Sequence, residues 1–513
     1  MPVPPRSHPT SIDVSDPLTP YDRLETHFAE LHQIKHARSV LSWDEAVLMS
    51  PGGGTARGEA LAALAALAHR SLTAPELSDA LEAAEADVKL LSHWQRANLR
   101  AMQRLHKNAV GIPEALVKAT QIANARCQQI WRTTRPTNDW KTVSQPLAEV
   151  VGLARENAAA LGEVLALEPY DALLDTYEEG TRAKGVTPIF DDLKSFLPDL
   201  IDRVLARQEA PKSLEGPFVP HDQRRLGEEM MRLLGFDFAR GRLDISHHPF
   251  CGGVPDDTRI TTRFDNHDFL ESFMAVLHET GHALYQQGLP AKWRGQPVGG
   301  SLGAAVHESQ SLFIEMQIGR SSAFMAFATP FIREHLGGSK GDHEWTAENL
   351  YVRAICVRPD YIRVGADELT YPLHILLRFE IEQSLITGEL SVSDIPDAWN
   401  DAMIRYLGLS TEGNFADGCM QDVHWFAGFF GYFPTYTLGA LMAAQWFAAA
   451  SACISDIDTK VEEGDFGPIV EWLRRQIHAQ GQLKTAHELL TEVTGEPLSS
   501  CHFKRHLERR YLG

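Results

Sequence analysis

Apolar residues recur at helical spacing along almost the whole of this 513-residue chain. In residues 21–47, Leu24, Phe28 and Leu31 lie three or four positions apart, which places them on one face of a helix. The same period, punctuated by Pro and Gly, appears in residues 56–69, 86–107, 113–133, 143–167, 188–207, 221–234, 269–287, 304–318, 342–356, 372–385, 432–453 and 469–477. The pattern therefore predicts a mainly α-helical fold.

One region departs from this helical period. Residues 258–264 are β-branched or aromatic and alternate in character, so Arg259, Thr261 and Arg263 would share one face of a strand. An extended peptide can pair its backbone with a strand of this kind. We therefore expect a small β-sheet immediately before the predicted helix over residues 269–287.

Composition and charge exclude several classes of protein. The first 20 residues are rich in Pro and Ser and lack an apolar core of signal-peptide length, so we expect a flexible leader. No later linker looks long enough to separate two independent domains, so we expect a single domain over residues 21–513. No uncharged apolar run is long enough to span a bilayer, and the net charge of −20 argues against binding to nucleic acid or to anionic membranes. The six cysteines are widely spread, as expected for reduced thiols in the cytoplasm.

A metal-binding pattern stands within an apolar stretch: His278-Glu279-Thr280-Gly281-His282 reads H-E-x-x-H. On a helix, residues four positions apart share one face, so both imidazoles can reach one tetrahedral zinc ion. Glu279 then lies beside the first ligand, where it can take a proton from an attacking water molecule. The alternatives are a helix that carries two histidines by chance and a non-catalytic helical protein with a structural zinc, although structural zinc sites are usually rich in Cys.

A catalytic zinc usually has three protein ligands and an open fourth position. Our candidate for the third ligand is Glu308, because an antiparallel pair of helices would bring it back to the motif. Glu315 is the rival, two turns further along the same face, whereas the adjacent His307 points away from Glu308. The pair His247-His248 has no carboxylate or Cys at ligand spacing, which favours a loop or packing role over metal binding.

Further short motifs follow one another in an order that matches a known pattern: Ser42-Trp43-Asp44, His248-Pro249-Phe250, Asp257-Thr258-Arg259-Ile260-Thr261, the H-E-x-x-H itself, His307-Glu308-Ser309-Gln310, Ile362-Arg363-Val364-Gly365-Ala366-Asp367-Glu368, Gly418-Cys419-Met420-Gln421-Asp422-Val423-His424-Trp425 and Gly431-Tyr432-Phe433-Pro434-Thr435-Tyr436. In these motifs the chain, from about residue 21 to its C-terminus, resembles the carboxypeptidase Taq family of zinc metallocarboxypeptidases.

The resemblance implies a single clamshell-like helical catalytic domain with a deep groove and the small sheet beside the metal site. An N-terminal helical part, about residues 21–240, would cover the groove, and residues 241–440 would hold the metal and substrate sites. It also implies removal of C-terminal residues from peptides with broad preference, and a homodimer. His248, in the second of the motifs, is then expected to contact the substrate.

Peptide hydrolysis needs donors for the negative charge that develops on the carbonyl oxygen. Tyr436 is our candidate, because its phenol lies in an aromatic segment broken by Gly and Pro, and its position in the resemblance supports this role. Tyr432 and His424 are the alternatives. All three residues could instead belong to an aromatic core.

An enzyme that acts at the chain end must also hold a terminal carboxylate, for which Arg offers a planar, two-pronged donor. Arg363 and Arg259 are the candidates; Asp367 can orient Arg363, or the two can form a surface ion pair. The predicted function is a metallocarboxypeptidase acting on peptides with a free C-terminal carboxylate, and the alternative is a zinc-dependent oligopeptidase that cuts internally. We expect Zn²⁺, with Co²⁺ or Mn²⁺ as substitutes, because metal choice follows availability as much as affinity.

Overall fold

The structure, a computed structural model, describes residues 18–337 and 343–513, so residues 1–17 of the predicted leader lie outside the described residues. Helices make up most of the described chain, which confirms the predicted fold class. Their bounds are α1 (Pro20–Val47), α2 (Gly54–Leu72), α3 (Pro75–Ala86), α4 (His93–Val110), α5 (Glu114–Thr134), α6 (Trp140–Leu165), α7 (Pro169–Tyr177), α8 (Ala183–Leu205), α9 (Pro220–Leu233), α10 (Phe269–Gly288), α11 (Ala304–Leu312), α12 (Ser322–Leu336), α13 (Ala347–Ala354), α14 (Tyr371–Thr387), α15 (Ile395–Leu407), α16 (Pro434–Cys453), α17 (Ile457–Glu462), α18 (Gly467–Gln476), α19 (Ala486–Thr494) and α20 (Cys501–Leu512).

Several predicted helices differ from those observed; the one over residues 342–356 begins only at Ala347, and residue 342 lies outside the described residues. The predicted helix over residues 86–107 began too early, because α3 ends at Ala86 and α4 begins only at His93, where Ser92 accepts the backbone N–H of Gln95 and caps the new helix. The predicted helix over residues 304–318 changes geometry at Phe313, where α11 passes into a π-helical segment, η6 (Phe313–Gly319). Such segments re-aim side chains and are frequent at functional sites.

The strand-like region forms the predicted small sheet, which has three strands, β1 (Gly241–Ile245), β2 (Phe250–Val254) and β3 (Asp257–Thr262), in the order β1-β3-β2. β1 runs parallel to the central strand β3 and β2 runs antiparallel to it. Arg263, predicted to share a face with Arg259, lies beyond the end of β3. At the β2 edge, the backbone N–H of Gly253 donates to Ser39 Oγ of α1.

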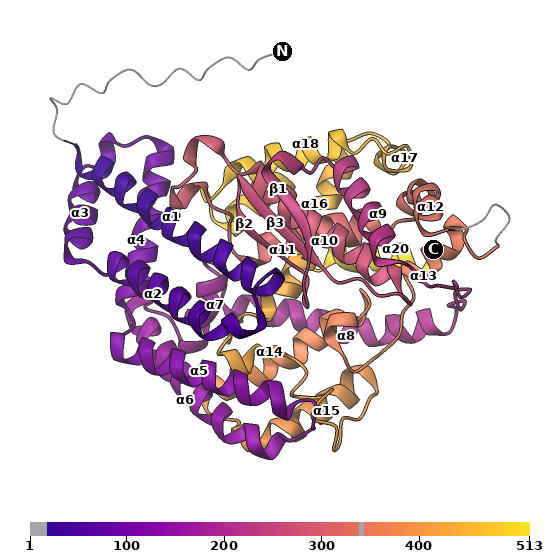
Figure 1. Ribbon diagram of the computed structural model, residues 1–513, viewed down its shortest axis with the longest axis horizontal. Helices are drawn as coiled ribbons and strands as arrows, with labels where there is room; N and C mark the ends of the chain where they lie inside the picture. Colours follow the sequence, from indigo (N-terminus) through magenta and orange to yellow (C-terminus); the bar gives the residue numbers. More distant parts are fainter. Residues whose placement is uncertain (1–17, 338–342) are drawn as a thin grey trace, which may run out of the picture.

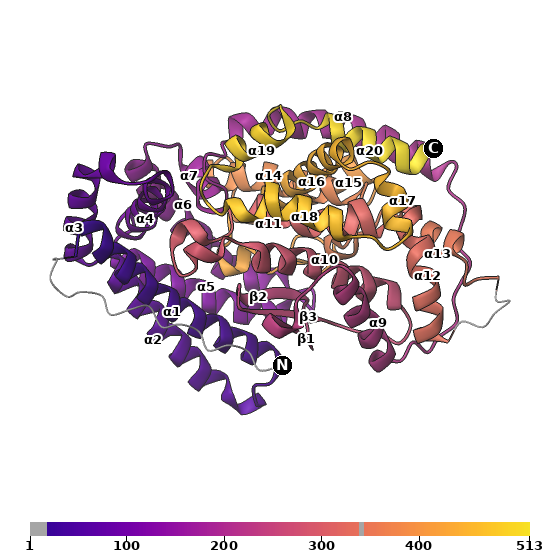
Figure 2. The same cartoon turned by 90° about the horizontal axis from the view of Figure 1, so that it is seen from above.

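Helix α10, which carries the H-E-x-x-H motif, runs through the middle of the molecule (Figures 1 and 2). Its residues are buried on nearly every side, as expected of a helix that is apolar all round. In Figure 2 the sheet lies on one side of α10, and α11, α16 and α18 lie on the other. Val276 of α10 packs with Leu243 and Ile260 of the sheet in one buried apolar cluster.

Two glycines let the central helices approach backbone to backbone. A Cβ atom at Gly281 of α10 would lie 2.4 Å from the carbonyl oxygen of Gln310 in α11, and one at Gly439 of α16 would lie 2.8 Å from Cβ of Glu308. Neither position has room for a larger side chain. As a result α10, α11 and α16 form one tight layer, with Gly281 between the two histidines of the motif.

The N-terminal helices lie together on one side of the molecule, where Figure 1 shows α1 to α4 in indigo and purple. A separate small apolar cluster, which includes Leu24, Phe28 and Leu81, joins α1, α3 and α4. Trp43 attaches α1 to the sheet, since the guanidinium groups of Arg242 and Arg259 lie 4.9 and 4.2 Å from the centroid of its ring. Among the helices of the described residues, none is both long and apolar enough to cross a membrane.

Candidate active site

The predicted metal ligands converge across the α10–α11 contact. One ligand atom from each of His278, His282 and Glu308 lies within 4.8 Å of the other two. Oε2 of Glu308 is 3.8 Å from Nε2 of His278 and 3.4 Å from Nε2 of His282. Two imidazole nitrogens and one carboxylate oxygen are the donor set of many catalytic zinc sites. The residues present therefore fit a divalent ion.

Both imidazole rings are held by their other nitrogen. Nδ1 of His278 lies 2.9 Å from Oε2 of Glu315, and Nδ1 of His282 lies 3.0 Å from the carbonyl oxygen of His307. A proton on each Nδ1 leaves both Nε2 atoms as acceptors facing Glu308. Partners on α11 and η6 thus fix the orientation of both rings.

The alternative ligands have other roles in the structure. Oε2 of Glu315 lies against Nδ1 of His278, and its Oε1 accepts from Nη2 of Arg320 at 2.7 Å, so its carboxylate orients the imidazole of His278. The ring of His307 stacks on that of His282 with centroids 4.3 Å apart, and its Nε2 lies 3.0 Å from the side-chain nitrogen of Gln286. Glu315 and His307 thus contact the predicted ligands His278 and His282, respectively.

Glu279 is buried on α10, in the motif that also carries the predicted ligands His278 and His282. Its atom Oε2 has no hydrogen-bond partner among the described residues, which is rare for a buried carboxylate oxygen. Burial raises the pKa of Glu279, while the charges of His278 and His282 act in the opposite direction. An acceptor left free beside a ligand cluster is suited to a water molecule or a substrate group.

A second buried carboxylate fixes the start of α11. Oε2 of Glu178, which follows the last residue of α7, accepts the backbone N–H groups of Ala305 and Val306 at 2.7 and 3.3 Å. Gly303 makes room for it, since a Cβ atom there would lie 2.3 Å from Oε1 of Glu178. Burial raises the pKa of Glu178 to about 7, against the effect of the two N–H donors. Sequence reasoning missed this residue, which anchors the helix that carries Glu308.

Arg363 lies in a buried cluster of two arginines and one carboxylate. Asp422 accepts from Nη2 of Arg363 at 2.8 Å and from Nη2 of Arg378 at 2.5 Å, and the exposed fractions of the two Arg side chains are 7% and 0%. Although burial alone would raise it, the two guanidinium groups hold the pKa of Asp422 far below its usual range. Asp367, which the sequence suggested as the partner of Arg363, instead accepts backbone N–H groups such as that of Thr370.

The aromatic candidates lie next to this cluster. The ring of Tyr436 is 5.0 Å from the guanidinium carbon of Arg363, and its hydroxyl lies 3.4 Å from Nε2 of His424. Tyr432 packs edge-on against Tyr436, with ring centroids 5.3 Å apart. Burial lowers the pKa of His424 to about 4 and raises that of Tyr436 well above its usual value. Gly439, one turn after Tyr436, packs closely against Glu308, so α16 approaches both the predicted ligand Glu308 and, through Tyr436, Arg363.

The two remaining candidates lie on or near the sheet. Arg259 directs its fork at Asp257 on the same strand, with Nη2 to Oδ2 at 2.9 Å, and stacks on Trp43. His248 is exposed in the turn between β1 and β2. Desolvation, the adjacent His247 and nearby cations such as Arg263 lower the pKa of His248.

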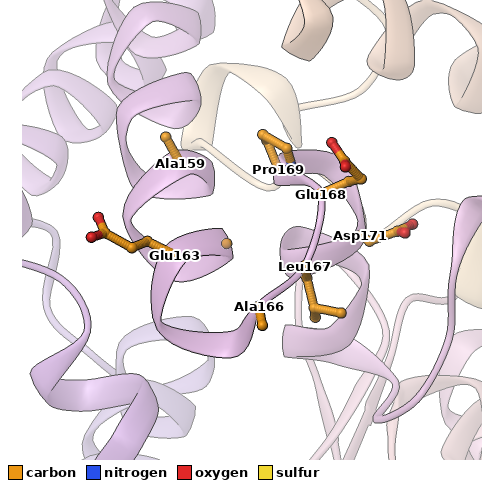
Figure 3. A pocket seen from close by; sticks show the side chains of 8 residues that line it. Ala159, Glu163, Ala166, Leu167, Glu168, Pro169 and Asp171 are labelled. Atoms are coloured by element: carbon orange, nitrogen blue, oxygen red, sulfur yellow. The ribbon is translucent and has the colours of Figure 1, made fainter.

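A separate cavity of about 570 Å³ lies between the end of α6 and the start of α7 (Figure 3). Its lining includes Glu163, Glu168 and Asp171 and none of the predicted site residues. The side chain of Asp171 is already engaged, because Oδ1 accepts the backbone N–H of Ala183 at 2.7 Å. The predicted site residues of the α10–α11–α16 layer therefore lie away from this cavity.

A mainly helical fold with an H-E-x-x-H helix at its centre defines a metallopeptidase. A sequence model of the carboxypeptidase Taq (M32) metallopeptidase family matches residues 23–511. The chain belongs to this family and is a hydrolytic carboxypeptidase of metal-dependent type.

Individual relatives agree with the family assignment. Thermostable carboxypeptidase 1 of Thermus thermophilus is 38% identical over 507 residues, covering 96% of this chain and 99% of the relative. Thermostable carboxypeptidase 1 of Pyrococcus furiosus is 35% identical over 493 residues, covering 94% and 97%. Among solved structures, metallocarboxypeptidase 1 of Trypanosoma cruzi superposes with a TM-score of 0.94 at 40% identity, covering 96% of this chain and 99% of that one.

Proposed function

We propose that the chain is a zinc-dependent carboxypeptidase with broad preference, and that His278, His282 and Glu308 hold the ion. The observation that carries the proposal is the convergence of two Nε2 atoms and one carboxylate oxygen within 4.8 Å, with each Nδ1 engaged by another partner. A zinc ion at such a site acts as a Lewis acid that polarises the scissile carbonyl and lowers the pKa of water. Co²⁺ and Mn²⁺ suit the same donors.

In this proposal Glu279 is the general base. Its free Oε2 accepts the proton of the attacking water and then delivers that proton to the departing amine. Burial on α10 keeps the carboxylate away from bulk water. Its place one residue after His278 on a rigid, buried helix fixes the direction from which it acts.

Tyr436 is the proposed donor to the oxyanion. Its hydroxyl is protonated at neutral pH, as that of an ordinary tyrosine with a pKa of about 10 is, and burial raises the pKa further, so it is a hydrogen-bond donor. His424, 3.4 Å from that hydroxyl, and Tyr432, packed against its ring, are proposed to contact the bound peptide. His248 and Arg259 extend the substrate contacts towards the sheet.

Arg363 is the proposed anchor for the terminal carboxylate. Arg363, Arg378 and Asp422 together carry one more positive than negative charge in a buried setting. Among its contacts with described residues, each Nη atom of Arg363 donates one of its two N–H groups, which leaves a second on each for a substrate. A surplus buried cation beside Tyr436 favours an anionic chain end.

A homodimer in the cytoplasm completes the proposal. Helix α2 exposes Ala62, Ala63, Ala66 and Leu67 to solvent, and an apolar helical face of this kind suits contact with a second copy of the chain. Light scattering of the purified protein tests the dimer.

The test of function compares a free-acid peptide with the same peptide bearing a C-terminal amide. We expect stepwise release of single residues from the acid, little release from the amide, and loss of activity with a chelator. Arg363→Ala should lower kcat/KM on the acid by about 100-fold or more, because the terminal carboxylate of the bound peptide is left unpaired in a buried site. Arg363→Lys should recover part of the lost activity.

The exposed Arg358, five positions before Arg363, provides the matched control, and Arg358→Ala should leave both rates unchanged. Efficient internal cleavage of the amidated peptide would favour the oligopeptidase instead. A normal rate on the acid with Arg363→Ala would transfer the anchor role to Arg259.

A further inference from the structure

Both ends of the loop after His424 are tied to one buried carboxylate, that of Glu382 in α14. The indole Nε1–H of Trp425 donates to Oε1 at 2.8 Å. The backbone N–H of Gly431 donates to Oε2 at 3.0 Å, and the hydroxyl of Tyr170 in α7 donates to the same oxygen at 2.9 Å. The residue has no solvent exposure. Donors from two distant segments of the chain thus meet at one side chain.

The chemistry of these donors requires a carboxylate. A backbone N–H and an indole N–H can only donate, so the group between them must accept on both of its atoms. A Gln at position 382 would place an NH₂ group against either Trp425 or Gly431 and leave a buried N–H unpaired. Burial raises the pKa of Glu382 to about 7 even though the three donors favour its ionised form.

The loop also lies against α7 at a position that only Gly permits. Gly431 has φ +81°, and a Cβ atom there would lie 2.9 Å from the backbone carbon of Leu173. Immediately beyond it, Tyr432 packs edge-on against Tyr177 of α7, with ring centroids 5.0 Å apart. The hydrogen bond from Gly431 to Glu382 therefore fixes the position of Tyr432 relative to α7.

The same face of α14 also binds the residues that flank His424. Arg378 precedes Glu382 by one helical turn and donates to Asp422 at 2.5 Å, while Glu382 accepts from Trp425. One face of a rigid, buried helix thus holds Asp422, Trp425 and Gly431, the residues on either side of His424 and just before Tyr432.

We propose that Glu382 is a positioning residue of the carboxypeptidase reaction, which holds His424, Tyr432 and Tyr436 in place against the peptide. Glu382 acts through these side chains and touches neither the peptide nor the ligand cluster. The inference rests on the proposed function, which gives the three side chains their contacts with the substrate.

The test is Glu382→Gln, assayed on the free-acid peptide well below the melting temperature. One unpaired buried N–H costs enough to displace the loop, so kcat/KM should fall about tenfold or more, with both kcat and KM affected. Metal content per chain should stay that of the parent, because the ligand cluster is untouched. Glu380→Gln is the matched control: Glu380, on the same helix, binds Lys194 and Tyr406 at a half-exposed position, and its loss should leave kcat/KM unchanged.

Leu385→Ala separates positioning from mere stability. It removes a fully buried side chain from α14 and lowers the melting temperature, while Glu382 and its three hydrogen-bond donors stay in place, so its kinetic constants should match the parent's. Tyr170→Phe removes one donor, preserves the shape and should cause a smaller loss of about threefold, which keeps the proposal testable if Glu382→Gln fails to fold.

Parent-like kcat/KM in Glu382→Gln, or in Tyr170→Phe if the first variant does not fold, would overturn the proposal. An equal loss in Leu385→Ala would do the same. A parent enzyme that cleaves acid and amide alike would instead count against the proposed function, and the effect of Glu382→Gln would still be measured on whichever peptide is cleaved.

Discussion

Asp422→Asn should destabilise the protein strongly, because it removes the only carboxylate in the Arg363–Asp422–Arg378 cluster. Arg363 Nε and Nη2 and Arg378 Nε and Nη2 all donate to Asp422, at distances between 2.5 and 3.2 Å. Asn keeps the shape and one acceptor oxygen. It raises the charge of the cluster by one unit and leaves two buried guanidinium groups facing each other.

The structure gives the size of the effect. At an effective dielectric constant of about 20, unit charges about 4 Å apart attract by about 4 kcal/mol, and Asp422 makes two such pairs. The desolvation of three buried ions offsets much of that attraction. Removing one partner of a buried pair costs about 3–5 kcal/mol, and the oxygen that Asn retains places this variant near 3 kcal/mol.

Urea denaturation at neutral pH, followed by circular dichroism, measures this loss in the free energy of unfolding, with an unchanged m-value as the check on the two-state assumption. Adding Arg378→Met restores the original net charge and should recover part of the loss. Asp401→Asn, at an exposed position of α15, is the control and should change stability by about 0.5 kcal/mol or less. A loss below about 1 kcal/mol, or a double variant less stable than Asp422→Asn alone, would refute the charge argument.

Further predictions concern the ligand cluster and the groups around it. Glu308→Ala should abolish stoichiometric metal binding in elemental analysis, and a variant that retains the metal would contradict its role as a ligand. Glu279→Gln should keep the metal and lose turnover by several orders of magnitude, and turnover within about tenfold of the parent would contradict its role as the general base. Tyr436→Phe should lower kcat by about 100-fold with little change in KM, and an unchanged kcat in steady-state assays would return Tyr436 to the aromatic core. Burial raises the pKa of Glu178 from 4.5 to about 7, so the folded protein binds this proton more tightly than the unfolded chain, and stability falls as pH rises through that window. Glu178→Gln should therefore lose less free energy of unfolding between about pH 5 and 7 than the parent, by up to about 3 kcal/mol, and identical denaturation profiles would exclude the shift.

The sequence was sufficient wherever the deciding geometry is local. Helical periodicity located most helices because a 3.6-residue repeat depends only on near neighbours. For the same reason, His278 and His282 could be placed on one face with Glu279 beside them. Glu308 required only the further assumption that the next helix folds back, which the α10–α11 pair shows.

Two glycines that indicate close helix packing are visible in the sequence, but their meaning was missed. Gly281 stands inside the metal motif, and Gly439 stands one turn after Tyr436. Both allow backbone contact between helices, and a Gly inside a buried helix indicates such an approach. Recognising them would have predicted that α11 lies between α10 and α16.

The partners of the buried charges were decided by tertiary structure alone. Asp367 is close to Arg363 in sequence, yet the fork of Arg363 points to Asp422, 59 positions away. Glu382 likewise meets Tyr170 across 212 positions. A charge buried in a low-dielectric interior needs a partner, and packing decides which partner lies within reach. The motif residues could therefore be identified from the sequence, whereas the pairing of the buried ions follows only from the fold.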